Sequence, residues 1–550
     1  MKIPVSEFIV RFMERLGIRH IFGMPGAHIL PVYDALHGSS IRTVLAKHEQ
    51  GAAFMAGGYA RASGRIGACI TTAGPGATNL VTGIANAYAD HLPVLAVTGE
   101  TSTHIFGRGG LQESSGEGGA IDQAALFRSI TRYARLVERT DYLPNVLNRA
   151  ARILLSKDPG PVLLSFPFNL QKERVEEELL ERIALHPSAG NGGPDPALLD
   201  RLCGHLLAAE HPVIVAGYGC IRAGAQPLVE RLSRRLGAPV ATSLKAKGVI
   251  GEDSPLSLGS LGVTSGGHAQ RHILERADLL LFLGAGFNER TSYTWDDALL
   301  EGRTLLQVDH DPEQLEKVFR ADLAVAGDIG EVLAGLLARL EGEDAAGEWR
   351  HRAPPAAGKR EAGSAFLSGF GLVERFFRAL ERRFPGPLMV FDDNIIFAQN
   401  LFQVSPHNRY FPNSGISSLG HAIPAAIGAR FVEEAPTFAI LGDGGFQMCG
   451  MELMTAVNYR IPLNVVLFNN GTMGLIRKNQ YQQYEGRYID CDFVNPDYRR
   501  LADAFGMAHH RVEREADVDA LFEELDLEGG LNLIEIVIDR DAFPDYRTRR

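Results

Sequence analysis

Two polar turns near the C-terminal end of the sequence have the residue types of a magnesium and phosphate site. The first is Gly442-Asp443-Gly444-Gly445, the second ends in Asn470, and each follows an apolar run that predicts a buried strand. Between them, residues 447–458 have a helix-like pattern, so the segment predicts a strand–helix–strand unit with both turns at the ligand-binding edge of a parallel sheet. Glycines allow backbone N–H groups to approach a phosphate, and Mg²⁺ prefers hard oxygen ligands. We expect a diphosphate held through Mg²⁺; a simple helix cap at Asp443 is the alternative.

The elements that must position these turns follow from the alternation of apolar runs and helical patterns along the chain. That alternation predicts an α/β protein with three doubly wound parallel sheets. Two Gly-, Pro- or otherwise polar-rich segments, 186–196 and 341–364, are expected to be linkers. The predicted domains are residues 1–180, 195–340 and 365–550.

Composition excludes several classes of function. The chain has 550 residues and a net charge of −11 without a basic stripe, so no nucleic-acid partner is expected. No apolar run is long enough to span a membrane, and the first residues do not form a signal peptide. The five scattered cysteines predict a reducing compartment, and we expect a cytoplasmic protein.

The spacing from Asp443 to Asn470 resembles the signature of thiamine-diphosphate enzymes, and the chain as a whole is most similar to the acetolactate (acetohydroxyacid) synthase large subunit. The resemblance implies a pyrimidine-binding first domain, a Rossmann-like central domain and a diphosphate-binding third domain. It also implies thiamine diphosphate and Mg²⁺ as cofactors. The metal ligands would be Asp443, Asn470 and the backbone carbonyl of Thr472.

Glu49 stands after a predicted strand, at the start of an Ala/Gly-rich helix. A carboxylate at this place is stabilised by the helix dipole, so by itself it reads as a cap. In thiamine-diphosphate enzymes, however, a glutamate at the matching position hydrogen-bonds the aminopyrimidine ring and promotes loss of the thiazolium C2 proton. The resemblance therefore assigns Glu49 a catalytic role.

Polar and Gly-rich loops follow the other strands of the first domain. Gly26 lies in a tight Pro-Gly loop, and Gly74 opens a Gly-Pro-Gly-Ala loop that resembles the family's. Acetolactate synthases have a Phe-Gln-Glu triplet whose Gln faces the reacting carbon. Here the triplet is Leu111-Gln112-Glu113, so Gln112 carries over as a catalytic candidate and the aromatic residue does not. We interpret His91 and His104 as structural or peripheral.

The segment 411–421 of the third domain resembles the family segment that holds the thiazolium and pyrimidine rings, with Leu419 as the wedge between them. His421 could contact the diphosphate or merely pack. Beyond Asn470, the family's Met-Val and Trp are replaced by Leu475, Ile476 and Asn479. Segment 481–492 could cover the site or be a surface coil. The resemblance gives these cofactor-binding residues: Gly26, Glu49, Gly74, Gly415, Ser417, Leu419, Gly442, Asp443, Gly444, Gly445, Asn470, Thr472, Gly474 and Leu475.

In the central domain, Gly217-x-Gly219 is a partial dinucleotide fingerprint with Arg222 in place of the third glycine, which is weak evidence. Acetolactate synthases bind FAD in this domain, whereas relatives bind ADP or nothing. Gly286 replaces the first arginine of the family's FAD-contacting stretch, so FAD is one of two open alternatives.

The resemblance implies decarboxylation of a 2-oxo acid, with pyruvate as the expected substrate, followed by carboligation to an acceptor carbonyl. No His-His pair like that of the decarboxylases stands in the first domain, which favours carboligation. A related decarboxylase, or a carboligase with another acceptor, is the alternative, and a non-catalytic homologue is a third reading. The family also implies a homodimer or homotetramer with active sites between subunits.

Overall fold

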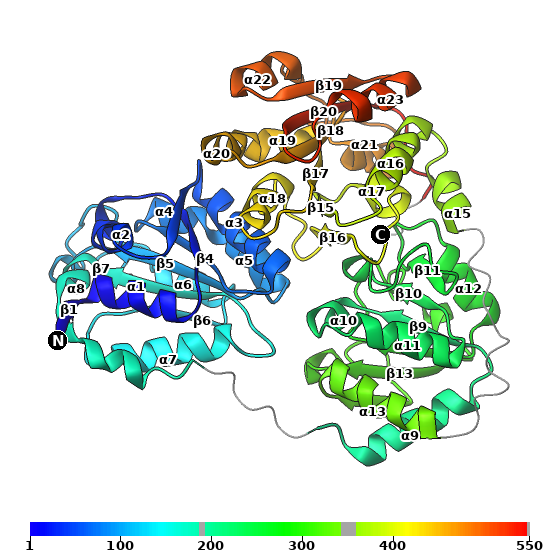
Figure 1. The fold of residues 1–550 in the computed structure, drawn as a ribbon, viewed down its shortest axis with the longest axis horizontal. Helices are drawn as coiled ribbons and strands as arrows, with labels where there is room; N and C mark the ends of the chain where they lie inside the picture. Colours follow the sequence, from blue (N-terminus) through cyan, green and yellow to red (C-terminus); the bar gives the residue numbers. More distant parts are fainter. Residues whose placement is uncertain (186–192, 343–358, 547–550) are drawn as a thin grey trace.

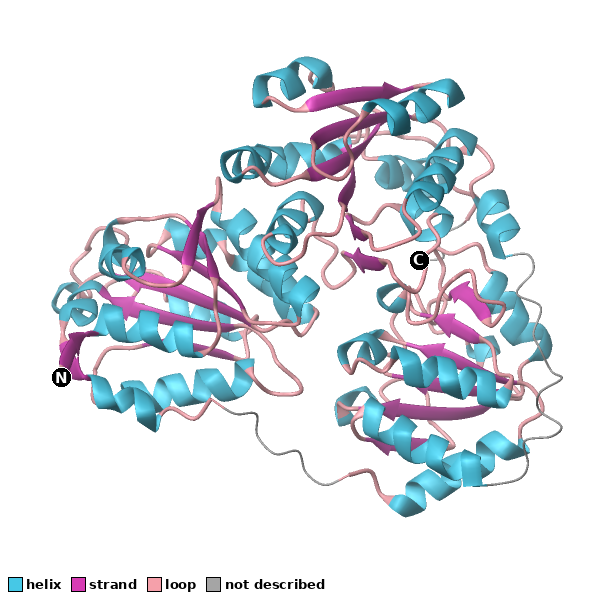
Figure 2. Cartoon of the chain, in the orientation of Figure 1, coloured by secondary structure: helices cyan, strands magenta, loops and turns pink. Residues whose placement is uncertain are grey.

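The structure is a computed structural model that describes residues 1–185, 193–342 and 359–546. Three six-stranded sheets, each parallel and flanked by helices, form the three parts of the chain (Figures 1 and 2). This arrangement confirms the predicted fold class. The predicted linkers lie partly outside the described residues, which exclude 186–192 and 343–358.

The first sheet has the strand order β3-β2-β4-β5-β7-β6. A two-stranded antiparallel ribbon of β1 (Lys2–Pro4) and β8 (Arg174–Glu176) lies beside it. The strands of the sheet are β2 (His20–Gly23), β3 (Arg42–Leu45), β4 (Gly67–Thr71), β5 (Val94–Glu100), β6 (Tyr133–Leu136) and β7 (Val162–Pro167). The helices are α1 (Val5–Arg15), α2 (Leu30–His37), α3 (Glu49–Ser63), α4 (Pro75–Asn79), α5 (Val81–Ala89), α6 (Gln123–Arg128), α7 (Leu143–Leu154) and α8 (Phe168–Lys172).

The central sheet has the order β11-β10-β9-β12-β13-β14. Its strands are β9 (Pro212–Ala216), β10 (Val240–Thr242), β11 (Ser257–Ser260), β12 (Leu279–Leu283), β13 (Thr304–Asp309) and β14 (Leu323–Ala326). Its helices are α9 (Pro196–Ala208), α10 (Tyr218–Arg222), α11 (Gln226–Leu236), α12 (His268–Arg276) and α13 (Ile329–Gly342). Apolar runs in the sequence predict the three longest strands, β9, β12 and β13. The short interior strand β10 and the short edge strands β11 and β14 were not predicted.

The third sheet has the order β16-β15-β17-β18-β20-β19, with β17 and β18 side by side at its centre. Its strands are β15 (Met389–Asp392), β16 (Arg409–Pro412), β17 (Thr437–Gly442), β18 (Leu463–Asn469), β19 (Ala508–Val512) and β20 (Leu531–Val537). Its helices are α15 (Lys359–Phe366), α16 (Gly371–Arg383), α17 (Ile396–Leu401), α18 (Ala422–Arg430), α19 (Asp443–Cys449), α20 (Leu453–Tyr459), α21 (Gly474–Gln483), α22 (Tyr498–Phe505) and α23 (Glu515–Glu524).

The helix predicted over 447–458 is wrong in its bounds. Helix α19 already begins at Asp443, and a 3-10 turn at Gly450–Glu452 separates it from α20. The early start has a physical reason, because the glycines after Asp443 can enter the first helical turn directly from the strand. The consequence is that Asp443 lies at a helix N-terminus.

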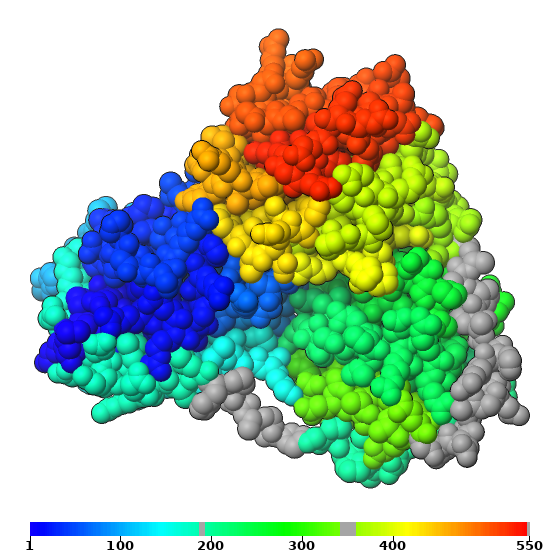
Figure 3. All heavy atoms as spheres, viewed as in Figure 1, coloured from blue at the N-terminus to red at the C-terminus, as the bar shows by residue number. Residues whose placement is uncertain are grey.

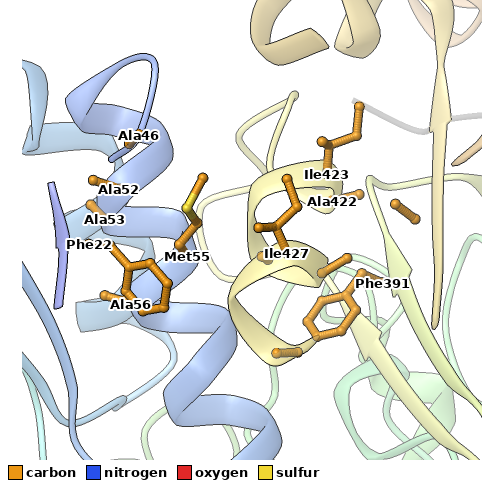
Figure 4. Close-up of a cluster of buried hydrophobic side chains, with 14 of the residues drawn as sticks. Phe22, Ala46, Ala52, Ala53, Met55, Ala56, Phe391, Ala422, Ile423 and Ile427 are labelled. Carbon is orange, nitrogen blue, oxygen red and sulfur yellow. The ribbon is translucent and has the colours of Figure 1, made fainter. Parts of the chain in front are cut away.

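Helices α3 and α18 join the first and third domains with almost no side chain between their backbones. A Cβ atom on Gly58 would lie 2.0 Å from the carbonyl oxygen of Ala425, and one on Gly428 would lie 2.0 Å from that of Met55. Figure 4 shows the buried cluster on both sides of this contact, with Met55 facing Ile427. The Ala/Gly-rich composition of both helices therefore serves a close helix–helix contact.

One buried carboxylate, that of Asp90, lies where all three domains meet. It forms ion pairs with Arg61 of the first domain and with Lys245 of the central domain, whose Nζ is 2.5 Å from Oδ1. Arg61 also donates to the carbonyl oxygen of Pro412 in the third domain, at 3.3 Å. Burial would raise the pKa of Asp90, but Arg61 and Lys245 outweigh it and hold the pKa at about 2. The three lobes meet near the middle of the space-filling view (Figure 3).

Within the described ranges, no helix combines the length and the apolar character needed to cross a lipid bilayer. The five cysteines are all buried and free.

Candidate active site

The structure brings the two polar turns of the third domain together through Asp443. Its Oδ2 accepts hydrogen bonds from the backbone N–H groups of Asn470, at 3.0 Å, and Gly471, at 2.6 Å, and from Nδ2 of Asn495, at 2.7 Å. Its Oδ1 accepts one bond, from the N–H of Gly444 at 3.0 Å. Burial raises the pKa of Asp443 above its usual value. A carboxylate at this place can still offer an Oδ1 lone pair to a cation.

The residues after Asn470 continue the same turn. The N–H of Thr472 donates to Oδ1 of Asn470 at 3.2 Å, so the side-chain oxygen faces its own loop. A Cβ atom on Gly474 would lie 3.0 Å from Nδ2 of Asn470, and one on Gly444 would lie 2.4 Å from Sδ of Met473. These two glycines are therefore needed for the turns to pack. The predicted metal ligands lie within one compact group.

The buried carboxyl group of Asp393 ties the segment 411–421 to α19. Asp393 directly follows β15, the strand that pairs with β17. Asp393 accepts from the N–H groups of Gly420, at 2.6 Å, and His421, at 3.1 Å. A Cβ atom on Gly445 would lie 2.6 Å from its Oδ2. Burial raises the pKa of Asp393 to about 7. The ring of His421 packs edge-on against Phe54 of the first domain at 5.2 Å, which favours packing as its role.

The segment 411–421 holds the remaining predicted contacts of the third domain. Ser417 has a left-handed backbone with φ of 56°, and the half-buried Leu419 follows it. Gly415 lies farther away, against Asp90, where a Cβ atom would be 2.7 Å from Oδ1. The structure thus places Gly415 at the domain junction. Ser417 and Leu419 lie just before Gly420 and His421, whose N–H groups bond Asp393.

Two predicted residues at the rim have few neighbours. A Cβ atom on Gly442 would meet only Ile395, at 3.9 Å, so packing does not require a glycine there. Leu475, near the start of α21, is 38% exposed. The segment 481–492 is closed by Gln480, whose side chain bonds both the N–H and the carbonyl of Ile489. Residues 481–483 end helix α21, and the rest form a surface loop with exposed Tyr484 and Ile489, so covering of the site stays a prediction.

In the first domain, Glu49 is the first residue of α3. Its Oε2 accepts a hydrogen bond from Nδ2 of Asn79 at 2.9 Å, so the end of α4 fixes the carboxylate. A Cβ atom on Gly76 would lie 3.5 Å from Oε1 and 2.3 Å from Oγ1 of Thr71. The glycine therefore leaves room beside the half-buried carboxylate.

Gln112 lies at the same edge of the sheet, in a loop where its own φ is 55°. Its Oε1 is 3.1 Å from Oγ1 of Thr72 and 3.2 Å from Nδ1 of His28. Gly74 and Gly26 allow the close approach of these loops, because a Cβ on Gly74 would lie 3.1 Å from Cβ of Gln112 and one on Gly26 would lie 2.5 Å from Cβ of Thr72. Gly26 and Gly74 thus lie beside the polar contact that Gln112 forms with Thr72 and His28.

A carboxylate of the third domain supports the start of α3. Oε1 of Glu452 accepts from the N–H groups of Lys47, at 3.0 Å, and His48, at 2.9 Å, directly before Glu49. Burial raises the pKa of Glu452. The 3-10 turn after α19 places this residue, so the two predicted half-sites of one chain are mechanically linked.

Sequence reasoning missed several polar residues of this group: His28, Thr72, Asn79, Asp393, Glu452 and Asn495. A signal existed for Asp393, because it comes shortly after the apolar run 387–391, and ligands bind at the carboxyl ends of parallel strands. The others act through contacts between loops that are distant in sequence, which no local pattern contains. The exposed His104 stays outside the group, and His91 pairs with Asp158 at 2.8 Å at the boundary to the central domain.

The central domain contains a cavity of about 550 Å³ that also reaches residues of the other two domains. Gly217 and Gly219 are required by packing against the end of β12, since a Cβ on Gly217 would lie 2.0 Å from the carbonyl oxygen of Gly284. Gly286 lines the cavity, where an added Cβ atom would lie 3.4 Å from Oε1 of Gln314. Its charged lining is mixed, with the cations Arg222, Lys245, Arg290 and Lys317 and the carboxylates Glu289, Asp309 and Asp311. The size suits a small-molecule ligand, and the cations can pair with an anionic group.

Comparisons with known proteins agree with this geometry. The models of the thiamine pyrophosphate enzyme N-terminal TPP binding domain, central domain and C-terminal TPP binding domain match residues 3–125, 199–336 and 394–536. The chain is 32% identical to a probable acetolactate synthase large subunit of Methanocaldococcus jannaschii, over 98% of this chain and 93% of that protein.

Two further relatives extend this result. The chain is 33% identical to an acetolactate synthase of Mycobacterium bovis, over 98% of this chain and 88% of that protein. It is 31% identical to the acetolactate synthase isozyme 2 large subunit of Escherichia coli, over 97% and 95%. The three domain matches and the similarity over nearly the whole length lead to one conclusion: the chain belongs to the thiamine pyrophosphate enzymes, the family that includes the acetolactate synthase large subunits.

Proposed function

We propose that this enzyme decarboxylates a 2-oxo acid, with pyruvate as the first candidate, and joins the remaining fragment to the carbonyl of an acceptor. The observation that carries the proposal is the full-length similarity to acetolactate synthases in a chain that keeps Glu49, Asp443 and Asn470. A related decarboxylase or a carboligase with another acceptor is the second candidate, because Leu475, Ile476 and Asn479 depart from the family pattern.

The residues of the third domain fit a magnesium diphosphate. Asp443, the side chain of Asn470 and the carbonyl of Thr472 would hold Mg²⁺, and the N–H groups of the 442–445 turn would face the diphosphate at the N-terminus of α19. Two buried polar atoms beside this turn, Oδ1 of Asn394 and Oγ of Ser418, have no hydrogen-bond partner among the described residues. A polar ligand would satisfy them.

Thiamine diphosphate supplies the electron sink for decarboxylation when it is bound. The chain's own part is to orient and to handle protons. Glu49, fixed by Asn79, would hold a proton at the aminopyrimidine end, and Leu419 would set the angle between the two rings. Gln112 would orient the reacting carbonyl from the loop at the edge of the first sheet.

The decisive assay incubates the protein with pyruvate, thiamine diphosphate and Mg²⁺ and identifies the products. Acetolactate with release of CO₂ supports the proposal. Acetaldehyde, or turnover of a different 2-oxo acid only, supports the second candidate. If no 2-oxo acid is consumed and the cofactor does not raise the unfolding temperature, the chain is a non-catalytic homologue and the proposal is refuted.

The central cavity is proposed to hold FAD, with ADP or no nucleotide as the alternative. The volume of about 550 Å³ and the four cationic side chains, which stand against three carboxylates, support an anionic ligand. Flavin absorbance of the purified protein, followed by release and identification of the nucleotide, decides between them.

We also propose a homodimer or homotetramer in which the first domain of one subunit completes the third domain of another. Large apolar side chains are exposed around the third-domain turns, and we take them as support for a covered surface. They are Met448, Met451, Ile489 and Val494, exposed by 56%, 62%, 69% and 94%. Light scattering of the purified protein measures the state. A cytoplasmic location is part of the same proposal.

A further inference from the structure

The imidazole of His28 is the one titratable ring in contact with Gln112 among the described residues. Its Nδ1 is 3.2 Å from Oε1 of Gln112, and its backbone is fixed from two sides. The carbonyl oxygen of His28 accepts from Nε2 of the buried Gln171 at 2.7 Å, and its N–H donates to Oγ1 of Thr72 at 3.4 Å. The ring is therefore held at the polar edge of the first sheet.

The hydrogen bond to Gln112 also sets the proton positions on the ring. Oε1 of Gln112 is an acceptor, so Nδ1 of His28 must be the donor in this amide orientation. In the neutral ring, the proton on Nδ1 leaves the lone pair on Nε2. The ring is half-buried, and no described residue forms a hydrogen bond with Nε2. The lone pair of Nε2, on the ring edge away from Gln112, can thus accept a proton and pass it on.

We propose that His28 is a catalytic acid–base residue of the carboligation step, a role that depends on the proposed function. In this step a bond forms between the donor carbon and the carbonyl carbon of the acceptor. The acceptor's carbonyl oxygen becomes a hydroxyl and gains a proton. The donor's hydroxyl loses a proton as its carbon becomes a ketone again, and the donor carbon's bond to the cofactor would break, with the electron pair returning to the cofactor. Nε2 of His28 takes the proton from the donor hydroxyl and gives it to the acceptor oxygen, so the exchange needs no further reagent.

The donor carbonyl is consumed and regenerated, and the released CO₂ leaves before this exchange. Loss of His28 should therefore affect bond formation to the acceptor more than release of CO₂. A residue that only positions Gln112 would impair both steps alike.

The test compares His28→Asn, His28→Ala and His37→Asn. Asn can keep a donor near the place of Nδ1 but lacks Nε2, and His37 is an exposed histidine at the end of the adjacent α2 that serves as the matched control. With pyruvate, we expect His28→Asn to lower acetolactate formation about 100-fold or more, the range for a general acid–base residue. The CO₂ released in the first turnover, measured before the retained donor fragment blocks the site, should fall much less. Added imidazole should partly restore His28→Ala, and His37→Asn should match the wild type.

A second measurement does not depend on turnover. Long-range ¹H–¹⁵N spectra of histidine-labelled apoprotein, with His28→Asn used to assign the signal, should show His28 as the Nδ1–H tautomer. Gln112→Ala should remove that preference.

The outcomes separate the two proposals. If the wild type forms acetolactate and His28→Asn forms it at the same rate, the role of His28 is refuted and the proposed function stands. An equal loss of first-turnover CO₂ and of acetolactate without rescue by imidazole also refutes it, because a positioning role then suffices. If the wild type consumes no 2-oxo acid, the proposed function fails and this inference fails with it.

Discussion

Replacing Gly58 by alanine should weaken the junction between the first and third domains, whereas the same change at the neighbouring Gly57 should not. Both glycines lie inside α3, so alanine gains about 0.5–1 kcal/mol of helix stability at either position. At Gly57 the new Cβ would meet only Cδ1 of Leu92 at 3.7 Å, an ordinary contact. Gly57→Ala should therefore be neutral or stabilising.

At Gly58 the new Cβ would lie 2.0 Å from the carbonyl oxygen of Ala425 and 2.6 Å from its Cα. Backbone atoms cannot rotate away, so α3 and α18 must separate by about an ångström, and overpacking of this kind costs about 1–3 kcal/mol. The helix gain is the same in both variants and cancels, so the two alanine variants should differ by the overpacking cost, about 2 kcal/mol. For domains of this size that is about 4–8 °C in unfolding midpoint.

The assay is thermal unfolding of the apoprotein, with intrinsic fluorescence and circular dichroism as two probes, since a three-domain chain need not unfold in one step. Gly428→Ala should behave like Gly58→Ala, because its Cβ would meet the carbonyl oxygen of Met55 at 2.0 Å. The double variant should lose less than the sum of both, because the first change already opens the contact. Equal midpoints for Gly57→Ala and Gly58→Ala would refute the reasoning.

Two further predictions concern the site, and a third concerns the buried carboxyl group of Glu100 at the end of β5. Glu49→Gln should lower turnover of pyruvate at least about 100-fold, since it removes an acid–base group, while the rise in unfolding temperature caused by thiamine diphosphate and Mg²⁺ stays; full activity would contradict the assignment. Asp443→Asn should abolish that Mg²⁺-dependent rise, whereas Asp503→Asn, in exposed α22, should keep it. Burial raises the pKa of Glu100 from 4.5 to about 7, so the wild type should lose stability relative to Glu100→Gln as the pH rises from about 4.5 to 7. Urea unfolding at pH 5 and pH 8 measures the gap, which should grow with pH by up to about 3 kcal/mol, and a constant gap would show that the carboxyl group does not ionise there.

The long apolar strands and the polar residues at their ends could be predicted from sequence, because burial and periodicity are local properties. Asp443 and Asn470 belong to this class, and so does the strand–helix–strand unit between them. The short strands β10, β11 and β14 of the central domain could not, because three or four residues carry too little pattern. His28 was missed for a different reason: its importance comes from Gln112, which lies 84 positions away.

The junction at Asp90 has a consequence for how the chain assembles. Its carboxylate is fully buried and gains compensation from two domains, while the third contributes only a carbonyl that orients Arg61. If the first and third domains docked before the central domain, the carboxylate would be left with a single cation in a dry environment, a costly arrangement. The three domains should therefore dock together, and Asp90 should stay hydrated until Lys245 of the central domain reaches it. The buried charge thus disfavours a chain in which only the first and third domains have docked.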